Sequence, residues 1–492
     1  MSEQQASYRQ IMKATSIFGG VQVFNILISI VRSKFVAVLL GPSGMGIMGL
    51  LTATTGMIGS LVNFGLGTSA VKDIAAAFGT NDVKRISLVV GVVRRLVWIT
   101  GLMGLVSTAI LSPWLSQITF GNKDYSLAFI WLSVTLLLNQ LSSGQLVLLQ
   151  GMRKLKHLAK ANLSGSFIGL FVTLPLYYLW GIDGIVPGII GTSLLSLFMS
   201  WYFSGKIKIE RTALSTSQTL AEGRSMLQLG FLISLSMLFS LASSYLLRIF
   251  ISHTGGIEQV GLYNAGFVII NTYVGLVFNA MGTDYYPRLS AVAHDNKLCN
   301  KTINQQAEIA ILILAPILIA FLIFINWLII LLYSNQFIAV TGMIYWAALG
   351  IFFKATSWSV AYIFLAKGAN KIFFWTELMG NFLLLVFNVL GYHWGGLTGL
   401  GHSFALYFLF YMIQIYWISK IKFQFAFNIS FAKIFAVQFG LAIVAFLTVK
   451  FFGQSNKYIF GVIVIGASGL YSIIELDKRL GILSFLKHQK FR

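Results

Sequence analysis

Two basic residues interrupt an apolar stretch long enough to cross a membrane. Residues 14–40 are almost wholly apolar, yet Arg32 and Lys34 lie among them. As one helix the stretch is about 40 Å long at roughly 1.5 Å per residue, against a hydrocarbon core of roughly 30 Å. A cation costs at least ~2.5 kcal/mol at mid-bilayer unless it faces a polar cavity. We therefore predict that Arg32 faces a cavity with an anionic partner rather than snorkelling to the headgroups. For Lys34 the two explanations are equally good.

Two more basic residues lie in later apolar segments. Arg248 falls in the segment 226–252, and Lys354 lies in the middle of 339–365, far from either end. Such intramembrane cations usually face a bundle interior rather than lipid. The pattern predicts a cationic cavity that involves Arg32, Arg248 and Lys354, with Lys34 as a weaker candidate.

Further charged residues are candidates for coupling or gating: Asp73, Asp284, Glu377 and Lys367. Glu377 lies about two turns into its segment, where it could form an ion pair with Lys354 or Lys367. A structural salt bridge is an equally good explanation of Glu377. The two aspartates have basic neighbours, Lys72 and Arg288, so local ion pairs are the alternative for them.

The composition is that of a multi-pass membrane protein. The 492 residues are 57% hydrophobic and 10% charged, with a mean hydropathy of +0.81, a balance that soluble domains do not have. The single cysteine, Cys299, excludes an internal disulfide and a cysteine metal cluster. Glu3 near the start and the lack of a small-residue cleavage site argue against a cleavable signal peptide.

The apolar segments long enough to span a membrane give about 14 transmembrane helices and only short connections. They are 14–40, 44–70, 86–111, 126–150, 158–180, 184–203, 226–252, 260–283, 307–333, 339–365, 371–391, 396–419, 431–452 and 457–475.

The basic residues follow the positive-inside rule. With the N-terminus inside, only Lys123, Lys450 and Lys457 of the 35 Lys and Arg residues fall in outer loops. Four more, Arg32, Lys34, Arg248 and Lys354, lie within the predicted spans. All the others fall on the cytoplasmic side. The net charge of +21 is thus a topology signal, with no nucleic-acid partner, and both termini are expected in the cytoplasm.

The chain also contains an internal repeat. The stretch 31–75 matches 247–290: Gly46 corresponds to Gly261 and Gly67 to Gly282, both at an offset of 215 residues, and Arg32 corresponds to Arg248. Six predicted spans separate the copies, so both have the same orientation. We therefore predict two pseudo-symmetric six-helix lobes related by an axis along the membrane normal, as in other transporters.

The motifs of several enzyme and pump classes are missing from the sequence. It contains no GxxxxGK[ST] phosphate loop, no HExxH motif and no large polar loop for an active site. We predict a protein that is not an enzyme, with no catalytic residues, no cofactor and no metal site.

Three stretches carry a resemblance to a known family. They are 39–46 with 64–68; 120–125 with 149–153; and the series Trp346, Gly350, Lys354, Trp358, Tyr362, Ala366-Lys367 and Glu377. Over about residues 10–420 the chain resembles the Wzx-type flippases of O-antigen and lipid III repeat units, within the multidrug/oligosaccharidyl-lipid/polysaccharide (MOP) superfamily. One departure is Phe353, where the family pattern leads us to expect an acidic residue.

The resemblance implies a substrate and a location. The substrate is a lipid-linked oligosaccharide on undecaprenyl diphosphate, moved from the cytoplasmic to the periplasmic leaflet of the bacterial inner membrane. Arginine suits a diphosphate because it binds phosphate oxygens bidentately, while amides such as Asn63, Asn264, Asn271 and Asn279 could bind sugars. Membrane lipid, a polymerase and a chain-length regulator are the implied partners.

We therefore predict an all-α integral membrane protein that works by alternating access. The predicted divisions are an N-lobe at 1–210, a C-lobe at 211–425, and two terminal helices with a cytoplasmic tail at 426–492. The alternatives are an ion-coupled multidrug antiporter of the same superfamily, which would need deep acidic residues, and a membrane enzyme of glycan assembly.

Overall fold

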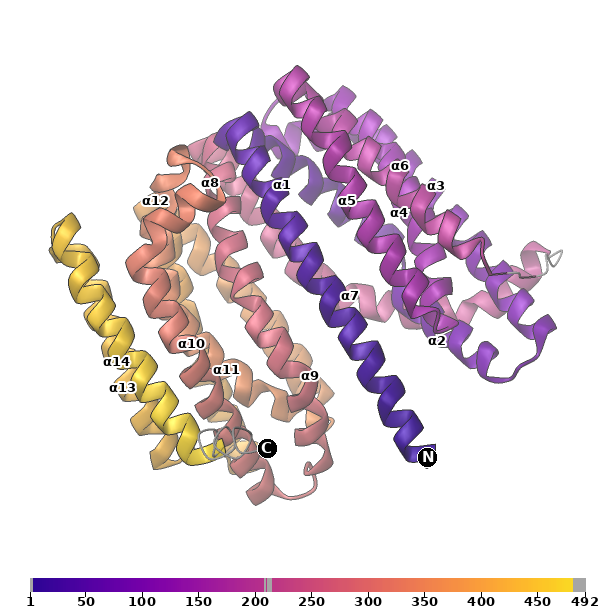
Figure 1. The fold of residues 1–492 in the computed structure, drawn as a ribbon. Helices are drawn as coiled ribbons and strands as arrows, with labels where there is room; N and C mark the ends of the chain where they lie inside the picture. Colours follow the sequence, from indigo (N-terminus) through magenta and orange to yellow (C-terminus); the bar gives the residue numbers. More distant parts are fainter. Residues whose placement is uncertain (1–2, 208, 210–214, 481–492) are drawn as a thin grey trace, which may run out of the picture. The chain divides into compact units, whose positions relative to one another are not determined.

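The protein is built from helices. A computed structural model describes residues 3–207, 209 and 215–480, and within them the regular structure is helical, with no strand. The all-α fold predicted from the sequence is confirmed. The helices (Figure 1) are α1 (Glu3–Val62), α2 (Leu66–Gly79), α3 (Val83–Phe120), α4 (Ser126–Gly151), α5 (Leu155–Trp180), α6 (Ile185–Ser204), α7 (Thr216–Gly255), α8 (Ile257–Phe267), α9 (Gly275–Ala291), α10 (Asn296–Leu332), α11 (Thr341–Ala366), α12 (Asn370–Phe423), α13 (Ile429–Phe451) and α14 (Gln454–Leu480).

Short helices of other types join some of these. They are the 3-10 helices η1 (Gly181–Gly184) and η3 (Asn335–Val340), and the π-helix η2 (Val268–Tyr273) between α8 and α9. In the described part of the chain, ten helical stretches are long and apolar enough to cross a membrane. The protein is therefore a multi-pass membrane protein. The count of fourteen spans and the cytoplasmic position of both termini stay predictions.

The chain divides into two compact units, Met1–Gly261 and Leu262–Arg492. The first unit contains α1 to α7 and the start of α8, and the second unit contains the remaining helices. The division predicted at 210/211 and 425/426 is a different description of the chain and stays a prediction.

Polar side chains begin several helices by accepting hydrogen bonds from the free N–H groups of the first turn. Asp82 is the N-cap of α3 and Asn428 is the N-cap of α13. At α7, Ser215 and Gln218 form a capping box. At α10, the Asp295 carboxylate accepts from the backbone N–H groups of Lys297 at 2.7 Å and Leu298 at 3.2 Å.

The predicted repeat has a counterpart in the backbone. Gly41, at the kink inside α1, has φ 65° and ψ −171°, and Gly256, between α7 and α8, has φ 88° and ψ 170°. The two glycines are 215 positions apart, the offset of the sequence repeat. Positive φ favours glycine because it has no Cβ, so the same residue type makes the same sharp turn in both copies.

The helix segments that follow these turns cross at a second pair of glycines. A Cβ added at Gly46 would lie 2.1 Å from the Ile257 carbonyl oxygen, and one added at Gly261 would lie 1.8 Å from that of Pro42. The contact is reciprocal, because Pro42 and Ile257 are themselves 215 positions apart. We call it the glycine crossing; it lies within the first unit.

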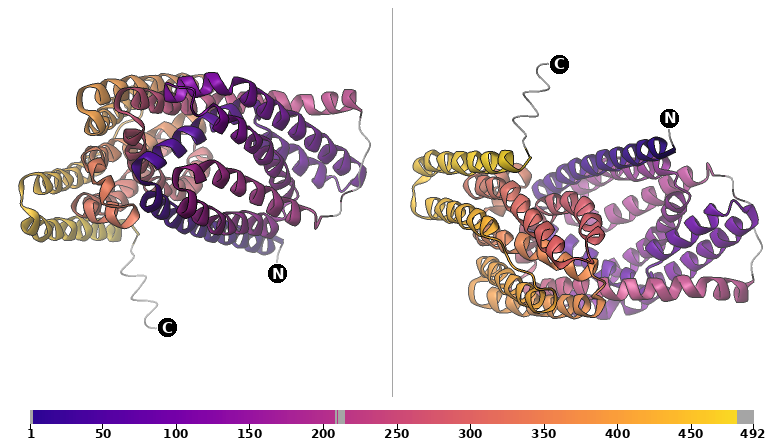
Figure 2. Two further views of the ribbon diagram at one scale, coloured as in Figure 1. Left: turned by 90° about the horizontal axis from the view of Figure 1, so that it is seen from above. Right: turned by 90° about the horizontal axis from the view of Figure 1, so that it is seen from below.

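The last two helices, α13 and α14, contact the second unit and each other at several points along their length. Figure 2 shows α13 and α14 side by side, and both pack along α10. Near the C-terminal end of α14, Arg479 Nε lies 2.8 Å from the buried carboxylate of Glu308 on α10. Between α13 and α14, the buried Gln438 amide donates to Ser472 Oγ at 2.8 Å and accepts from Ser468 Oγ at 2.6 Å. These contacts make the pair part of the second unit.

Candidate functional site

Arg32 lies on α1 and reaches toward α5. Its Nη2 donates to the Ser166 carbonyl oxygen at 3.3 Å, and Nη2 would lie 3.2 Å from a Cβ added at Gly169. Its Nε is buried and has no hydrogen-bond partner among the residues that the structure describes. No described carboxylate lies within 4 Å of it. Arg32 is thus a half-buried cation whose hydrogen-bonding capacity is only partly used.

The other two predicted cations of the first unit are also half-buried. Lys34 lies close to Arg32 on α1, and Arg248 lies near the end of α7. The Arg248 guanidinium donates through Nη1 to the Ser244 carbonyl oxygen at 3.0 Å and to the Ser244 hydroxyl. Ser244 is one turn earlier on the same helix, so these bonds hold the guanidinium along α7.

Lys354 lies in the second unit on α11. Its Nζ donates to Asn271 Oδ1 at 2.9 Å. Three aromatic rings surround the ammonium, with centroids 5.9 Å (Phe278), 5.7 Å (Phe404) and 5.2 Å (Phe408) from Nζ. Cation–π attraction operates at these distances. Among the side chains that the structure describes, no carboxylate lies within 4 Å of Nζ.

The ion pair considered for Glu377 with Lys354 or Lys367 does not form among the described residues. Glu377 accepts a hydrogen bond from Tyr411 Oη at 2.9 Å, whereas Lys354 binds Asn271 and Lys367 Nζ donates to the Ala293 carbonyl oxygen at 2.5 Å. Each lysine therefore has a neutral oxygen acceptor in place of the carboxylate. Contacts between helices decide these partners, and spacing along one helix does not reveal them.

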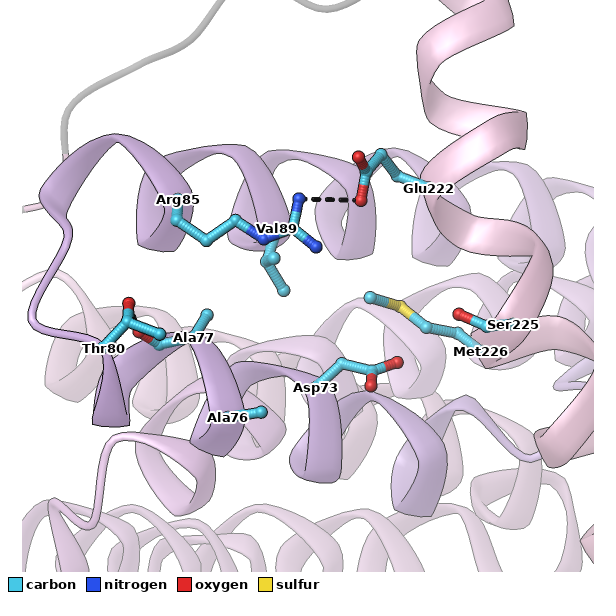
Figure 3. Close-up of a pocket in the computed structure, with 9 residues that line it drawn as sticks. All are labelled: Asp73, Ala76, Ala77, Thr80, Arg85, Val89, Glu222, Ser225 and Met226. Atoms are coloured by element: carbon cyan, nitrogen blue, oxygen red, sulfur yellow. Dashed lines mark hydrogen bonds and ion pairs between the residues drawn. The ribbon is translucent and has the colours of Figure 1, made fainter.

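The two aspartates differ from each other. Asp284 is largely exposed and lies 3.8 Å from Arg288 Nε, one turn away, which is the local pairing expected as the alternative to a coupling role. Asp73 on α2 forms no ion pair within the described residues and lines a cavity of about 210 Å³. Figure 3 shows its carboxylate across this space from the ion pair of Arg85 and Glu222, which are 2.8 Å apart.

The predicted cations are divided between the two compact units. Arg32, Lys34 and Arg248 belong to the first unit, and Lys354 belongs to the second, so a single cavity that holds all of them stays a prediction. Sequence reasoning overlooked the buried pair of Glu308 and Arg479. One signal was available: Glu308 is an acidic residue at the start of the predicted apolar segment 307–333.

The arrangement favours an anionic ligand. Arg32 and Lys354 are cations in membrane-spanning helices, and the partners of both among the described residues are neutral oxygens or aromatic rings. A charge held away from water is costly unless it is paired and hydrogen-bonded. Phosphate oxygens would supply charge-assisted acceptors, which are shorter and stronger than amide acceptors. No group of three or more His, Cys, Asp or Glu that could hold a metal occurs in the described part of the chain.

Comparison with known sequences finds one family and several relatives. The family described as polysaccharide biosynthesis protein matches residues 35–342. The lipid III flippase of Escherichia coli (strain K12) is 24% identical over 370 residues, which cover 73% of this chain and 85% of the relative. A putative O-antigen transporter of Shigella flexneri is 24% identical over 404 residues, or 80% of this chain and 93% of the relative.

Comparison with solved structures finds the same fold. The lipid II flippase MurJ in an inward closed conformation has a TM-score of 0.70 at 12% identity, over 95% of this chain and 99% of MurJ. An inward-facing multidrug resistance MATE family transporter of the MOP superfamily has a TM-score of 0.69 at 14% identity, over 81% and 94% of the two chains. The resemblance to MOP-superfamily flippases predicted from the sequence is confirmed.

Proposed function

We propose that this chain, which belongs to the polysaccharide biosynthesis protein family, is a flippase for lipid-linked oligosaccharides. Its substrate is a repeat unit on undecaprenyl diphosphate, of the O-antigen type or a related surface polysaccharide. The protein carries the headgroup from the cytoplasmic to the periplasmic leaflet of the bacterial inner membrane by alternating access. The reaction is transport, in which no bond is made or broken.

One observation supports this proposal above the others: Arg32 and Lys354 are intramembrane cations with neutral protein partners. A diphosphate supplies the negative charge and the oxygen acceptors that these cations lack within the protein. The oligosaccharide lies beside them, and the polyprenyl chain stays in lipid. An amine cargo of the multidrug kind would be repelled by both cations, so the shared MATE fold does not favour the antiporter.

The names of the relatives agree with this choice of substrate. Two of them are described as a lipid III flippase and a putative O-antigen transporter, and both align over most of their length. The chemistry of the substrate headgroup is thus inferred from the relatives, and its contacts are inferred from the cations of this chain.

The proposal is tested by surface glycan display in a bacterial strain that lacks its own flippase. The strain carries the wild-type chain, Arg32→Ala or Lys354→Ala, and protein levels are compared by immunoblot. We expect both variants to be present in the membrane, to display little glycan and to accumulate lipid-linked repeat units inside the cell.

Lys123→Ala is the matched control, because Lys123 is an exposed basic residue in a loop between α3 and α4. It should display glycan as the wild type does. Normal display by both the Arg32 and the Lys354 variants would refute the role of the two cations. Failure of the wild-type chain to restore display with any repeat unit tried would count against the flippase function itself.

A further inference from the structure

The partner of Lys354 lies in an unusual backbone segment. Asn271 belongs to η2, a six-residue π-helix between α8 and α9. A π-helix has i→i+5 hydrogen bonds in place of i→i+4 bonds, is rare, and is frequently found at functional sites. If η2 returned to α-helical geometry, the residues on one side of it would rotate by about 100°, the angle per residue of an α-helix. Asn271 lies within this segment, so such a change would alter the position of its amide relative to Lys354.

Among the described residues, the hydrogen-bonding capacity of the ammonium is only partly used. An ammonium has three N–H donors, and Asn271 Oδ1 accepts one of them. The rings of Phe278, Phe404 and Phe408 attract the positive charge, but they are poor hydrogen-bond acceptors. A ligand with several anionic oxygens binds such a group better than one neutral amide does. The amide is therefore a partner that an anion can displace.

The enclosure of Lys354 is connected to a larger aromatic cluster. Phe278 contacts Trp358 with ring centroids 5.3 Å apart, and Trp358 contacts Tyr362 at 5.1 Å and Tyr285 at 5.7 Å. Tyr285 is fully buried and donates a hydrogen bond to the Ser359 carbonyl oxygen. The cluster packs α9 against α11, and Phe278 belongs both to it and to the rings around Lys354.

We propose that Asn271 is a positioning residue that competes with the anionic group of the substrate for the Lys354 ammonium. In the structure described here the amide holds the ammonium among the three rings. Binding of the diphosphate displaces the amide, and η2 supplies the backbone freedom for its withdrawal. This inference rests on the proposed function, because it takes the diphosphate as the ligand of Lys354.

The test measures binding of farnesyl diphosphate, a short polyprenyl diphosphate, to the full-length protein in detergent by isothermal titration calorimetry. Removing a competitor increases the fraction of protein that is ready to bind. We therefore expect Asn271→Ala to lower the dissociation constant about threefold or more. Asn271→Leu, which keeps the side-chain volume and removes the acceptor, should do the same. Asn271→Asp should raise the dissociation constant, because its carboxylate pairs with Lys354 and repels the diphosphate.

A double-mutant cycle with Lys354→Ala separates competition from other causes. If Asn271 acts through Lys354, the effect of Asn271→Leu disappears in the Lys354→Ala background. Asn296→Asp, at an exposed position at the start of α10, is the control for the change from amide to carboxylate and should bind as the wild type does.

The outcomes distinguish the inference from the function on which it rests. An unchanged or raised dissociation constant for both Asn271→Ala and Asn271→Leu overturns the competition and leaves the diphosphate site intact. If Lys354→Ala binds farnesyl diphosphate as the wild type does, or the wild type does not bind it, Lys354 is not a diphosphate ligand. In that case the binding role of Lys354 and the competition are both overturned.

Discussion

The glycine crossing is a place where adding one methyl group should separate two helices. The Cβ of Gly46→Ala would lie 2.1 Å from the Ile257 carbonyl oxygen, while real Cβ contacts are essentially never closer than 3.0 Å. The helices must therefore move apart by about 0.9 Å. A backbone carbonyl cannot rotate away as a side chain can, and overpacking of this kind costs about 1–3 kcal/mol.

The chain offers matched controls for this change. Gly56 and Gly59 lie on the same segment of α1, and a Cβ at either position meets no atom within 4 Å. There the exchange of glycine for alanine should leave stability unchanged or raise it by up to about 1 kcal/mol, because alanine favours the helix. The Gly46→Ala variant should thus be less stable to unfolding than the Gly56→Ala and Gly59→Ala variants.

The assay is unfolding of the purified protein in mixed micelles of detergent and SDS, followed by tryptophan fluorescence. The double variant Gly46→Ala/Gly261→Ala should lose less than the sum of the single variants, because one separation of the helices relieves both contacts. If Gly46→Ala unfolds at the same SDS fraction as Gly56→Ala, the close approach of the two segments is not a feature of the protein in solution and the reasoning is refuted.

Two further predictions concern the ends of α14 and α10. Arg479→Ala leaves the buried Glu308 carboxylate without its 2.8 Å partner, so it should lose about 3–5 kcal/mol of stability in the same unfolding assay; wild-type unfolding would contradict this. Two backbone N–H groups hold the pKa of Asp295 below its usual range. The stabilisation by the Asp295 cap is therefore fully present above the pKa that Asp295 has in the unfolded chain. It is lost as the pH falls through the lower pKa of Asp295 in the folded protein. Protection of the Leu298 amide against hydrogen exchange should decrease over that range, and Asp295→Asn should remove the pH dependence.

The sequence predicts the features that depend on local chemistry. Length and hydropathy indicate a helical membrane protein. The repeat predicted from Gly46/Gly261 and Gly67/Gly282 has the same offset as the backbone turns that the structure shows at Gly41 and Gly256. The positions of Arg32 and Lys354 within apolar segments are also visible in the sequence. Each of these features depends on residues within one segment.

The partners of these residues depend on contacts between segments. Asn271 is 83 positions from Lys354, and Glu308 is 171 positions from Arg479. Sequence spacing suggested Glu377 as the partner of Lys354, but the fold brings Tyr411 to Glu377. The π-helix η2 has no signature that helical periodicity reveals, because it differs from its neighbours in hydrogen-bond register.

The reciprocal contacts of the glycine crossing also bear on the origin of the chain. A contact in which residue i meets residue j and residue j meets residue i is the pattern of an isologous interface between two identical subunits. An ancestral homodimer whose genes were later fused accounts for this pattern. At the offset of 215 residues, the counterpart of Lys354 is Asn139. Subunits encoded by one gene cannot differ at one position, so duplication of the gene is the step that allows a cation in one copy of the repeat and a neutral amide in the other.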